Sequence, residues 1–269
     1  MQRDNKILLR PAWSSADNQS RLYQSDCLVI MDLLIDENPA GCFDMIFADP
    51  PYKLSNGGIS CQSGKMVSVD KGAWDRSNGV EEDHLFTMTW LAKCQKLLKP
   101  NGTIWVSGTM HLIYSVGFAL QKLNFKILND IIWEKPNPPP NLACRYFTHS
   151  TETILWAAKE KKSKHYFNYN EMKSTNGGKQ MKSVWRMTSP KKHEKGQGKH
   201  PAQKPLELVS RCIQACTVVD DIIFDPFSGS GTTGVAALSM NRKFVGIENN
   251  AEYVDLSIRR LSNITKTGE

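Results

Sequence analysis

The sequence predicts an α/β domain built on a largely parallel sheet. The apolar run at residues 43–47 meets Ala48-Asp49-Pro50-Pro51-Tyr52, a pattern typical of a buried parallel strand that opens into a loop. Near the other end of the chain, a strand at 221–224 leads into a glycine-rich turn, a helix and a strand that ends at Glu248. Ligands of open α/β sheets bind at the carboxyl ends of strands, so both patterns indicate a site at that edge.

Length and composition indicate one domain and a polyanionic partner. The 269 residues suffice for one large α/β domain, or for such a domain with an insert. Lys and Arg exceed Asp and Glu by 34 to 27, which gives a net charge of +7. No apolar stretch approaches the ~18 residues of a membrane span, and residues 1–4 lack a signal-peptide core. We therefore expect a soluble, cytoplasmic protein with no membrane partner.

The seven cysteines are scattered and include no Cys-x-x-Cys pair. This spacing argues against both a disulfide framework and a zinc site. We interpret the cysteines as packed free thiols and predict no bound metal.

The first elements are a strand and a capped helix. Residues 1–20 show no periodicity and are expected to form an arm or loop. Residues 21–24 favour a short strand, after which Ser25-Asp26 can cap a helix. Asp26 is thus either a helix cap or a ligand contact at a strand end.

A long loop and a strand-helix pair follow the Pro-Pro turn. Residues 53–79 are rich in Gly, Ser and Asn and predict a lid over the site. Residues 81–98 predict an amphipathic helix, ended by the turn chemistry of Pro100-Asn101-Gly102. A strand at 103–107 and a helix at 112–123 are expected next.

The middle of the chain is strongly basic. Strands are predicted at 126–133 and 152–158, joined by an extended loop around the Pro run at 138–140. Residues 159–199 then carry a net charge of +9, with aromatic side chains among the cations. That pattern suits stacking and phosphate contacts with nucleic acid, and the alternative is a solvated surface insert. Helices are predicted at 205–217 and 253–261.

The residues Asp49-Pro50-Pro51-Tyr52 form an arrangement that can hold an amino group. The Asp49 carboxylate and the Pro50 carbonyl are neighbouring acceptors, and together they can bind both hydrogens of one amine. Tyr52 offers a flat face on which a base can stack. The alternative is a strand end with a rigid turn and an ordinary buried Tyr.

The glycine-rich turn predicts a nucleoside site. Its glycines let the backbone approach a ligand, and Glu248 follows Gly231 by seventeen residues. This is close to the spacing of about twenty for an acid that binds ribose hydroxyls. The phosphate-loop pattern is absent, which favours a nucleoside without a pyrophosphate.

At these residues the sequence resembles the amino-DNA methyltransferases. Residues 225–233 look like their S-adenosylmethionine motif, and residues 49–52 look like their catalytic motif. The catalytic motif comes first, as in the permuted β class, and residues 200–205 are similar to that class's His-Pro-Thr-Gln-Lys-Pro element, with Ala202 replacing Thr. Residues 54–60, 67–72 and 144–153 further resemble the companion adenine methyltransferases of DpnII-type restriction systems, which act on GATC.

The resemblance implies a circularly permuted, Rossmann-like methyltransferase sheet. Residues 1–158 would form its catalytic part, 159–199 a basic target-recognition segment, and 200–269 the cofactor-binding part. The implied cofactor is S-adenosylmethionine, and its expected contacts are Asp26, Cys27, Asp49, Lys204, Asp225, Phe227, Gly229, Gly231, Thr232, Thr233 and Glu248.

The implied reaction is site-specific methylation of adenine N6 in DNA. The base would be flipped out of a duplex, or taken from a single strand, and held by Asp49, Pro50, Pro51 and Tyr52. Cytosine N4 is the close alternative, and a non-catalytic DNA-binding regulator is a second; a nicotinamide oxidoreductase or an RNA or protein methyltransferase fits less well. A homodimer is possible, as is a companion restriction endonuclease that is not in direct contact.

Overall fold

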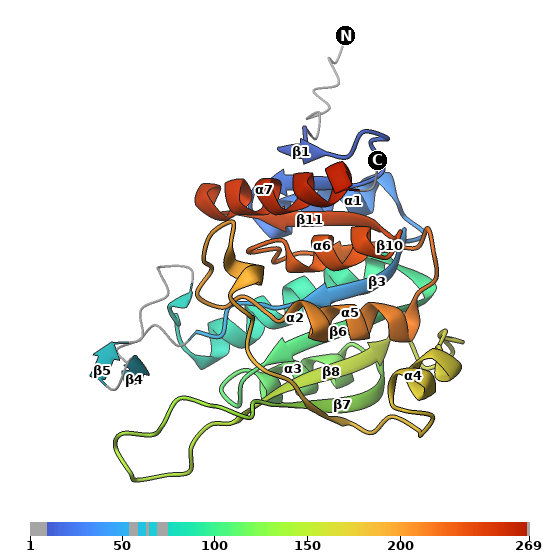
Figure 1. The fold of residues 1–269 in the computed structure, drawn as a ribbon. Coiled ribbons are helices and arrows are strands. Elements are labelled where there is room, and N and C mark those ends of the chain that lie inside the picture. The colour runs from blue at the N-terminus through green and yellow to red at the C-terminus, as the bar shows by residue number, and fades with distance from the viewer. Residues whose placement is uncertain (1–9, 54–58, 63–64, 69–74, 268–269) are drawn as a thin grey trace.

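The computed structural model describes residues 10–53, 59–62, 65–68 and 75–267. A nine-stranded sheet carries helices on both faces, which confirms the expected α/β class (Figure 1). Its strands run in the order β1-β2-β11-β10-β3-β6-β8-β7-β9. These are β1 (Trp13–Ser14), β2 (Arg21–Gln24), β3 (Phe43–Ala48), β6 (Leu98–Gly108), β7 (Lys126–Glu134), β8 (Thr151–Ala158), β9 (Val184–Arg186), β10 (Ile222–Asp225) and β11 (Lys243–Glu248). A separate antiparallel pair consists of β4 (Ile59–Gln62) and β5 (Lys65–Ser68).

Five neighbouring strands of the large sheet are parallel. β2, β11, β10, β3 and β6 run the same way, so their carboxyl ends meet at one edge. β8 pairs antiparallel with β6, and β7 pairs antiparallel with β8. β9 runs parallel to β7, and β1 pairs antiparallel with β2. The edge where the parallel strands end is where such sheets bind ligands.

The helices cover the sheet as two layers, each above its own apolar core. One layer holds α1 (Cys27–Glu37), α2 (Val80–Leu97) and α3 (Ile113–Lys122). The other holds α5 (Leu206–Cys216), α6 (Thr232–Ser239) and α7 (Ala251–Thr267). The short helix α4 (Tyr169–Thr175) and the 3₁₀ turn η2 (His193–Lys195) lie within the basic segment. No helix in the described residues is both long and apolar enough to cross a bilayer.

The N-terminal and C-terminal parts of the chain meet where β3 pairs with β10. Ile223 pairs with Met45 and Phe224 pairs with Ile46, although these strands are almost 180 residues apart. The rings of Phe43 and Phe224 stack with centroids 4.5 Å apart and planes 6° from parallel. This pairing places the terminal βαβ unit beside the Asp-Pro-Pro-Tyr strand, as the permuted order implies.

The Pro100-Asn101-Gly102 turn was predicted to separate a helix from a strand, and this prediction was wrong. β6 already begins at Leu98, and the ladder with β3 jumps from Leu98 to Thr103. The extra residues form a bulge opposite Asp44, where a Cβ on Gly102 would lie 2.9 Å from the Phe43 carbonyl oxygen. Glycine is needed there because the two backbones approach so closely.

The loop expected at 53–79 is also more structured than predicted, because it contains the β4–β5 pair. The residues of this loop at 54–58, 63–64 and 69–74 lie outside the described part of the chain. Whether the segment acts as a lid stays a prediction.

The basic segment crosses the molecule instead of forming a separate insert. Ser163 donates to the Pro100 carbonyl at the start of β6, and the Asn168 amide donates to the Ala215 carbonyl near the end of α5. β9 then adds a strand to the sheet edge and returns the chain to the carboxyl-end side. In Figure 1 α4 and the β4–β5 pair lie at opposite ends of the molecule. Residues 159–182 are therefore far from the edge that was predicted to bind ligands.

Two side-chain predictions need correction. Trp185 is one of the aromatic residues of the 159–199 segment that were expected to suit stacking on nucleic acid, but it is only 5% exposed and packs near Trp105 with ring centroids 6.2 Å apart. Among the cysteines, Cys144 is an exposed free thiol and not a packed one. It lies in the extended loop between β7 and β8, in a run of exposed residues.

Candidate active site

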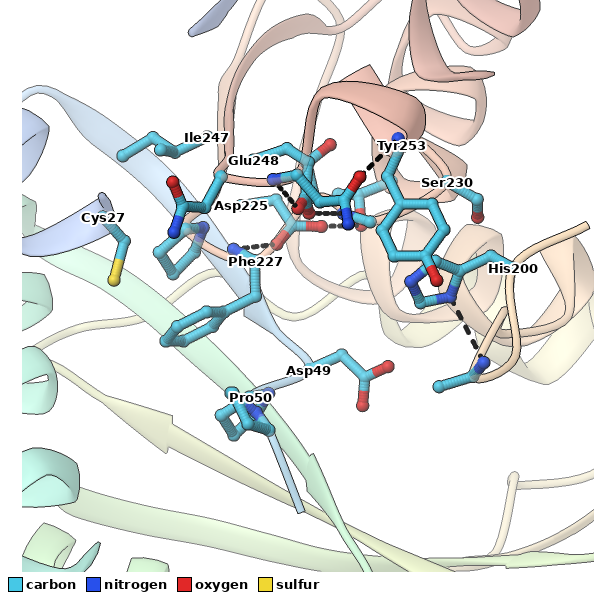
Figure 2. A pocket seen from close by; sticks show the side chains of 18 of the residues that line it. Cys27, Asp49, Pro50, His200, Asp225, Phe227, Ser230, Ile247, Glu248 and Tyr253 are labelled. Carbon is cyan, nitrogen blue, oxygen red and sulfur yellow. Dashed lines mark hydrogen bonds between the residues drawn. The ribbon is translucent and has the colours of Figure 1, made fainter. Parts of the chain in front are cut away.

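A cleft of about 710 Å³ opens at the carboxyl ends of β2, β3, β10 and β11. Figure 2 shows Asp49 and Pro50 facing Glu248 and Tyr253 across the cleft, with the Phe227 ring between them and Cys27 toward one end. Every residue of the predicted site except Gly231 lines this cleft: Asp26, Cys27, Asp49, Pro50, Pro51, Tyr52, Lys204, Asp225, Phe227, Gly229, Thr232, Thr233 and Glu248.

Gly231 supports the turn from behind. Its φ of +73° lies in the left-handed region, and a Cβ would lie 2.9 Å from Oγ of Ser257 on α7. The structure thus explains this glycine by helix packing and does not place it at the ligand surface.

Asp225 braces the turn between β10 and α6. Its carboxylate accepts hydrogen bonds from the Phe227 amide at 2.9 Å and from the Thr233 hydroxyl at 2.6 Å. Burial raises the pKa of Asp225 to about 7, and these two bonds only partly oppose the shift. The carboxylate therefore shapes the turn from inside.

Glu248 lies where a ribose-binding acid was expected. Its two oxygens accept hydrogen bonds from the amides of Gly229 and Asn250, each at 2.8 Å. Burial raises its pKa, although these backbone donors favour the ionised form. Each oxygen keeps a further lone pair that can accept from a hydroxyl group in the cleft.

The end of β2 supplies Asp26 and Cys27. Asp26 is the N-cap of α1, with Oδ1 accepting from the Leu28 amide at 2.8 Å, and it also lines the cleft. The two interpretations of this residue are therefore compatible. Burial raises the pKa of the Cys27 thiol to about 12, so it serves as a neutral apolar wall and not as a nucleophile.

Asp49 is the centre of a polar network. Its Oδ1 accepts from the hydroxyls of Ser107 at 2.5 Å and Tyr52 at 2.7 Å, and its Oδ2 accepts from Nζ of Lys204 at 2.6 Å. Lys204 is 6% exposed; burial acts to lower its pKa, but the Asp49 and Glu152 carboxylates raise it above the ordinary value. Removing one partner of such a buried pair typically costs roughly 3–5 kcal/mol.

Tyr52 is packed more tightly than a free stacking platform. It is 6% exposed, and its hydroxyl lies 2.7 Å from Asp49 and 3.1 Å from Oε2 of Glu152. Burial and both carboxylates raise its pKa, so the hydroxyl stays a donor. Nζ of Lys204 covers one face of the ring at 5.0 Å from its centroid. This face of the ring is therefore closed to a base unless Lys204 moves.

A smaller cleft of about 250 Å³ adjoins the first across Tyr52 and Lys204. Trp133, Lys135 and Glu152 form part of its wall. The two clefts thus share Tyr52 and Lys204, two of the residues that donate hydrogen bonds to Asp49.

Comparison with known proteins assigns the chain to a family. The model of a family described as DNA methylase matches residues 43–259, which include both predicted motifs. The chain belongs to the DNA methylase family.

The methylase matches bacterial proteins over nearly its whole sequence. It is 53% identical to Type II methyltransferase M2.DpnII of Streptococcus pneumoniae over 262 residues, covering 97% of this chain and 96% of the relative. It is 50% identical to Type II methyltransferase M2.MboI of Moraxella bovis, covering 96% and 93%. The resemblance to the companion methyltransferases of DpnII-type systems is confirmed.

Solved structures agree with the fold of the methylase. The M1.HpyAVI complex with S-adenosylmethionine superposes with a TM-score of 0.68 at 29% identity, covering 89% of this chain and 98% of that one. The PvuII cytosine-N4-specific methyltransferase has a TM-score of 0.72 at 19% identity, over 97% and 96% of the two chains. The second likeness is evidence for the fold alone.

The methylase site also contains residues that the sequence patterns did not reveal. Arg260 on α7 is 7% exposed and donates from Nη1 to the Ser230 carbonyl oxygen at 2.5 Å and to Oγ1 of Thr232 at 2.9 Å. Ser107 and Glu152 complete the network around Asp49. A polar residue in an apolar strand was the one available signal for Ser107, while Arg260 fell within the helix predicted at 253–261 and was not singled out.

His200 is another residue that was not assigned a role. Its ring packs edge-on against Tyr253 with centroids 4.2 Å apart, and it lies against Gly229. The similarity of residues 200–205 to a family element was the signal for this position. The expected hydroxyl at 202 is replaced by Ala202, whose amide donates to Nδ1 of His200.

Proposed function

We propose that the chain transfers a methyl group from S-adenosylmethionine to N6 of adenine in GATC sites of DNA. The observation that carries this proposal is that the Asp49 carboxylate and the Pro50 carbonyl share a cleft with Glu248 and the turn from Asp225 to Thr233. An acceptor pair for an amine and a nucleoside-binding turn are the two parts that the reaction needs.

The residues of the cleft fit the proposed cofactor. Within the described part of the chain, Oγ of Ser228 and Oε1 of Gln203 are buried polar atoms without a hydrogen-bond partner, and both residues line the cleft. Such atoms need a ligand or water partner. Glu248 would hold the ribose, while Cys27 and Phe227 would contact the adenine ring. When bound, S-adenosylmethionine supplies a methyl group activated by its positively charged sulfur.

The chain contributes positioning and charge. A target base cannot react while it is stacked in DNA, so it enters the cleft flipped out. Its amino group donates to the Asp49 carboxylate and the Pro50 carbonyl, which orient the nitrogen lone pair toward the cofactor side. Holding the reacting groups in line in a dry, charged cleft provides most of the expected acceleration.

DNA contacts are proposed for one half of the basic segment. Residues 186–199 run from the end of β9 to the mouth of the cleft, and Lys195 and His200 line the smaller cleft. We assign target recognition to this half, together with the loop between β7 and β8. Residues 159–182 are on the far side and are not assigned to the recognition surface.

Adenine is favoured over cytosine by the family relationship. The relatives include the M2.DpnII and M2.MboI enzymes, and an Asp at the first position of the catalytic motif is typical of the adenine group that the sequence resembles. We further propose that the chain acts in the bacterial cytoplasm beside a companion restriction endonuclease that it does not contact.

A homodimer is part of the proposal. On the neighbouring helices α2 and α3, Leu85, Tyr114 and Phe118 are 66%, 77% and 54% exposed. Large apolar side chains grouped on one surface favour association. Light scattering on purified protein tests this. A protein that remains monomeric at about 100 µM, a concentration well above the Kd of a typical stable dimer, would contradict the homodimer.

Product analysis tests the reaction. The protein is incubated with S-adenosylmethionine carrying a labelled methyl group and with GATC oligonucleotides, duplex and single-stranded, and the DNA is digested to nucleosides. We expect N6-methyladenine, and none from oligonucleotides that lack GATC. N4-methylcytosine as the sole product contradicts the adenine assignment, and cofactor binding without any methylated product favours the regulator alternative.

The Asp49→Ala variant tests the role of the carboxylate. It should lose methyl transfer while calorimetry still detects S-adenosylmethionine binding. Asp255→Ala, on the exposed face of α7, is the matched control and should behave as the wild type. Methyl transfer retained by Asp49→Ala contradicts the proposed mechanism.

A further inference from the structure

The Asp49 carboxylate has donors on both oxygens. Ser107 and Tyr52 lie 2.5 Å and 2.7 Å from Oδ1, and Nζ of Lys204 lies 2.6 Å from Oδ2. A carboxylate offers about four lone-pair positions, and these three donors leave one position, on Oδ2. An amino group that binds there shares Oδ2 with the Lys204 ammonium, and two donors on one oxygen weaken the bond between Lys204 and Asp49.

Lys204 cannot simply release its ammonium to water. The side chain is 7% exposed, and a buried charge without a partner is strongly disfavoured. A second anion lies close by, because Oε2 of Glu152 is 3.6 Å from Nζ. A shift of about 1 Å brings this pair to the ordinary length of a charge-assisted hydrogen bond.

Glu152 is held ready for this exchange. It lies on β8, and its Oε1 accepts from Nζ of Lys135 at 2.5 Å, just beyond the end of the neighbouring strand β7. Its Oε2 faces the Tyr52 hydroxyl at 3.1 Å. Although burial acts to raise the pKa of Glu152, Lys204 and Lys135 hold it below its ordinary value, so the group stays ionised.

We propose that Glu152 is a positioning residue for methyl transfer, which takes over the Lys204 ammonium when the target amino group occupies Asp49. The inference rests on the proposed role of Asp49 as the acceptor of that amino group. In the exchange, one hydrogen bond to Oδ2 replaces another, and the ammonium keeps an anionic partner throughout. Glu152 thereby lets Asp49 exchange one hydrogen-bond donor for another without leaving the buried Lys204 ammonium unpaired.

Replacement of the charge tests the proposal. Glu152→Gln keeps the size of the side chain and an acceptor for Tyr52, but it removes the anion. We expect kcat for DNA methylation to fall about 10- to 100-fold, as for other buried charge pairs that lose one partner. The KM for DNA and the Kd for S-adenosylmethionine without DNA should remain unchanged. Glu171→Gln, at an exposed position of α4, is the matched control. A wild-type kcat in Glu152→Gln overturns the proposal.

A double-mutant cycle tests whether Glu152 acts through Lys204. Glu152→Gln and Lys204→Met are measured singly and together. If the carboxylate works by receiving the ammonium, the second change adds little to the loss in kcat caused by Lys204→Met. Losses that multiply as independent effects overturn the proposal.

Two further variants, Glu152→Asp and Asp49→Ala, complete the test. If Glu152→Gln does not fold, as judged by lost S-adenosylmethionine binding, Glu152→Asp takes its place. It keeps the charge but withdraws it by one methylene, and an unchanged kcat in this variant also overturns the proposal. Asp49→Ala distinguishes a failure of the proposed function from a failure of the proposed role of Glu152. An active Asp49→Ala contradicts the proposed function itself, whereas an inactive Asp49→Ala beside a fully active Glu152→Gln contradicts only the role of Glu152.

Discussion

The Thr233 hydroxyl, in the first turn of α6, donates a 2.6 Å hydrogen bond to Oδ2 of Asp225, the last residue of β10. The bond closes the glycine-rich turn between strand and helix. It does so with a carboxyl group whose pKa burial raises from an ordinary value of 3.8 to about 7. The turn from Asp225 to Thr233 is therefore built on a group whose pKa lies near neutral pH.

This shift predicts a pH-dependent stability. Because the folded state binds the Asp225 proton more tightly than the unfolded state, the contribution is complete below the unfolded pKa and is lost as the pH rises through 7. We expect the free energy of unfolding without cofactor, from urea denaturation, to decline between about pH 4 and 7 and to level off above about pH 8. Asp225→Asn should make the decline shallower, and the remainder includes Glu248, whose pKa is also raised. Equal slopes for variant and wild type contradict the assignment.

Glu248 should determine cofactor affinity. Glu248→Ala removes the acceptor for the Gly229 and Asn250 amides together with the proposed ribose contact. We expect the Kd for S-adenosylmethionine to rise about 10- to 100-fold, which corresponds to the loss of charged hydrogen bonds worth about 1.5–3 kcal/mol. Isothermal calorimetry measures this. Glu252→Ala, at an exposed position of α7, should leave the Kd unchanged; equal effects of the two substitutions argue against a ribose site.

Arg260 should stabilise the turn from behind. Arg260→Met keeps much of the apolar stem but removes the donors to Ser230 and Thr232. We expect the free energy of unfolding to fall by about 1–3 kcal/mol, because buried acceptors lose their partner. Urea denaturation gives the value, and Arg259→Met on the exposed side of the same helix is the control. If the two variants are equally stable, the buried guanidinium has no structural role.

The two halves of the basic segment should differ in DNA binding. Lys191 and Lys192 lie near the cleft, whereas Lys161 and Lys162 lie between β8 and α4, and all four are exposed. Replacing the first pair by Ala should weaken binding to duplex DNA. It should also make the slope of log K against log salt concentration shallower by up to about 2. The second pair should change neither quantity, as measured by fluorescence anisotropy over a salt series. Identical salt slopes for the two double variants contradict the assignment of the recognition surface.

The elements that sequence predicted well are those decided locally. The strands at 21–24 and 126–133 and the helix at 112–123 end within a residue or two of the observed bounds, because alternation, helical spacing and caps act over short stretches. The Asp-Pro-Pro-Tyr and glycine-rich motifs also located the cleft. In both cases the informative residues are neighbours in the chain.

What the sequence did not reveal depends on distant partners. Glu152 and Tyr52 are 100 residues apart, and the burial of Trp185 depends on Trp105 across the sheet. The bulge at Gly102 exists only because β3 lies against it. No periodicity encodes such contacts, so the network around Asp49 and the path of residues 159–182 emerge only from the fold.

The stacked rings of Phe43 and Phe224 have a consequence for the order in which the two parts of the chain can be encoded. They join the part of the chain that carries Asp49 to the part that carries Glu248 through side-chain packing and strand pairing, with no peptide bond at that junction. The site depends on which strands are neighbours in space. It does not depend on which of the two parts comes first in the chain. A coding sequence that exchanged the two halves would specify the same site, provided that new connections spanned the sheet.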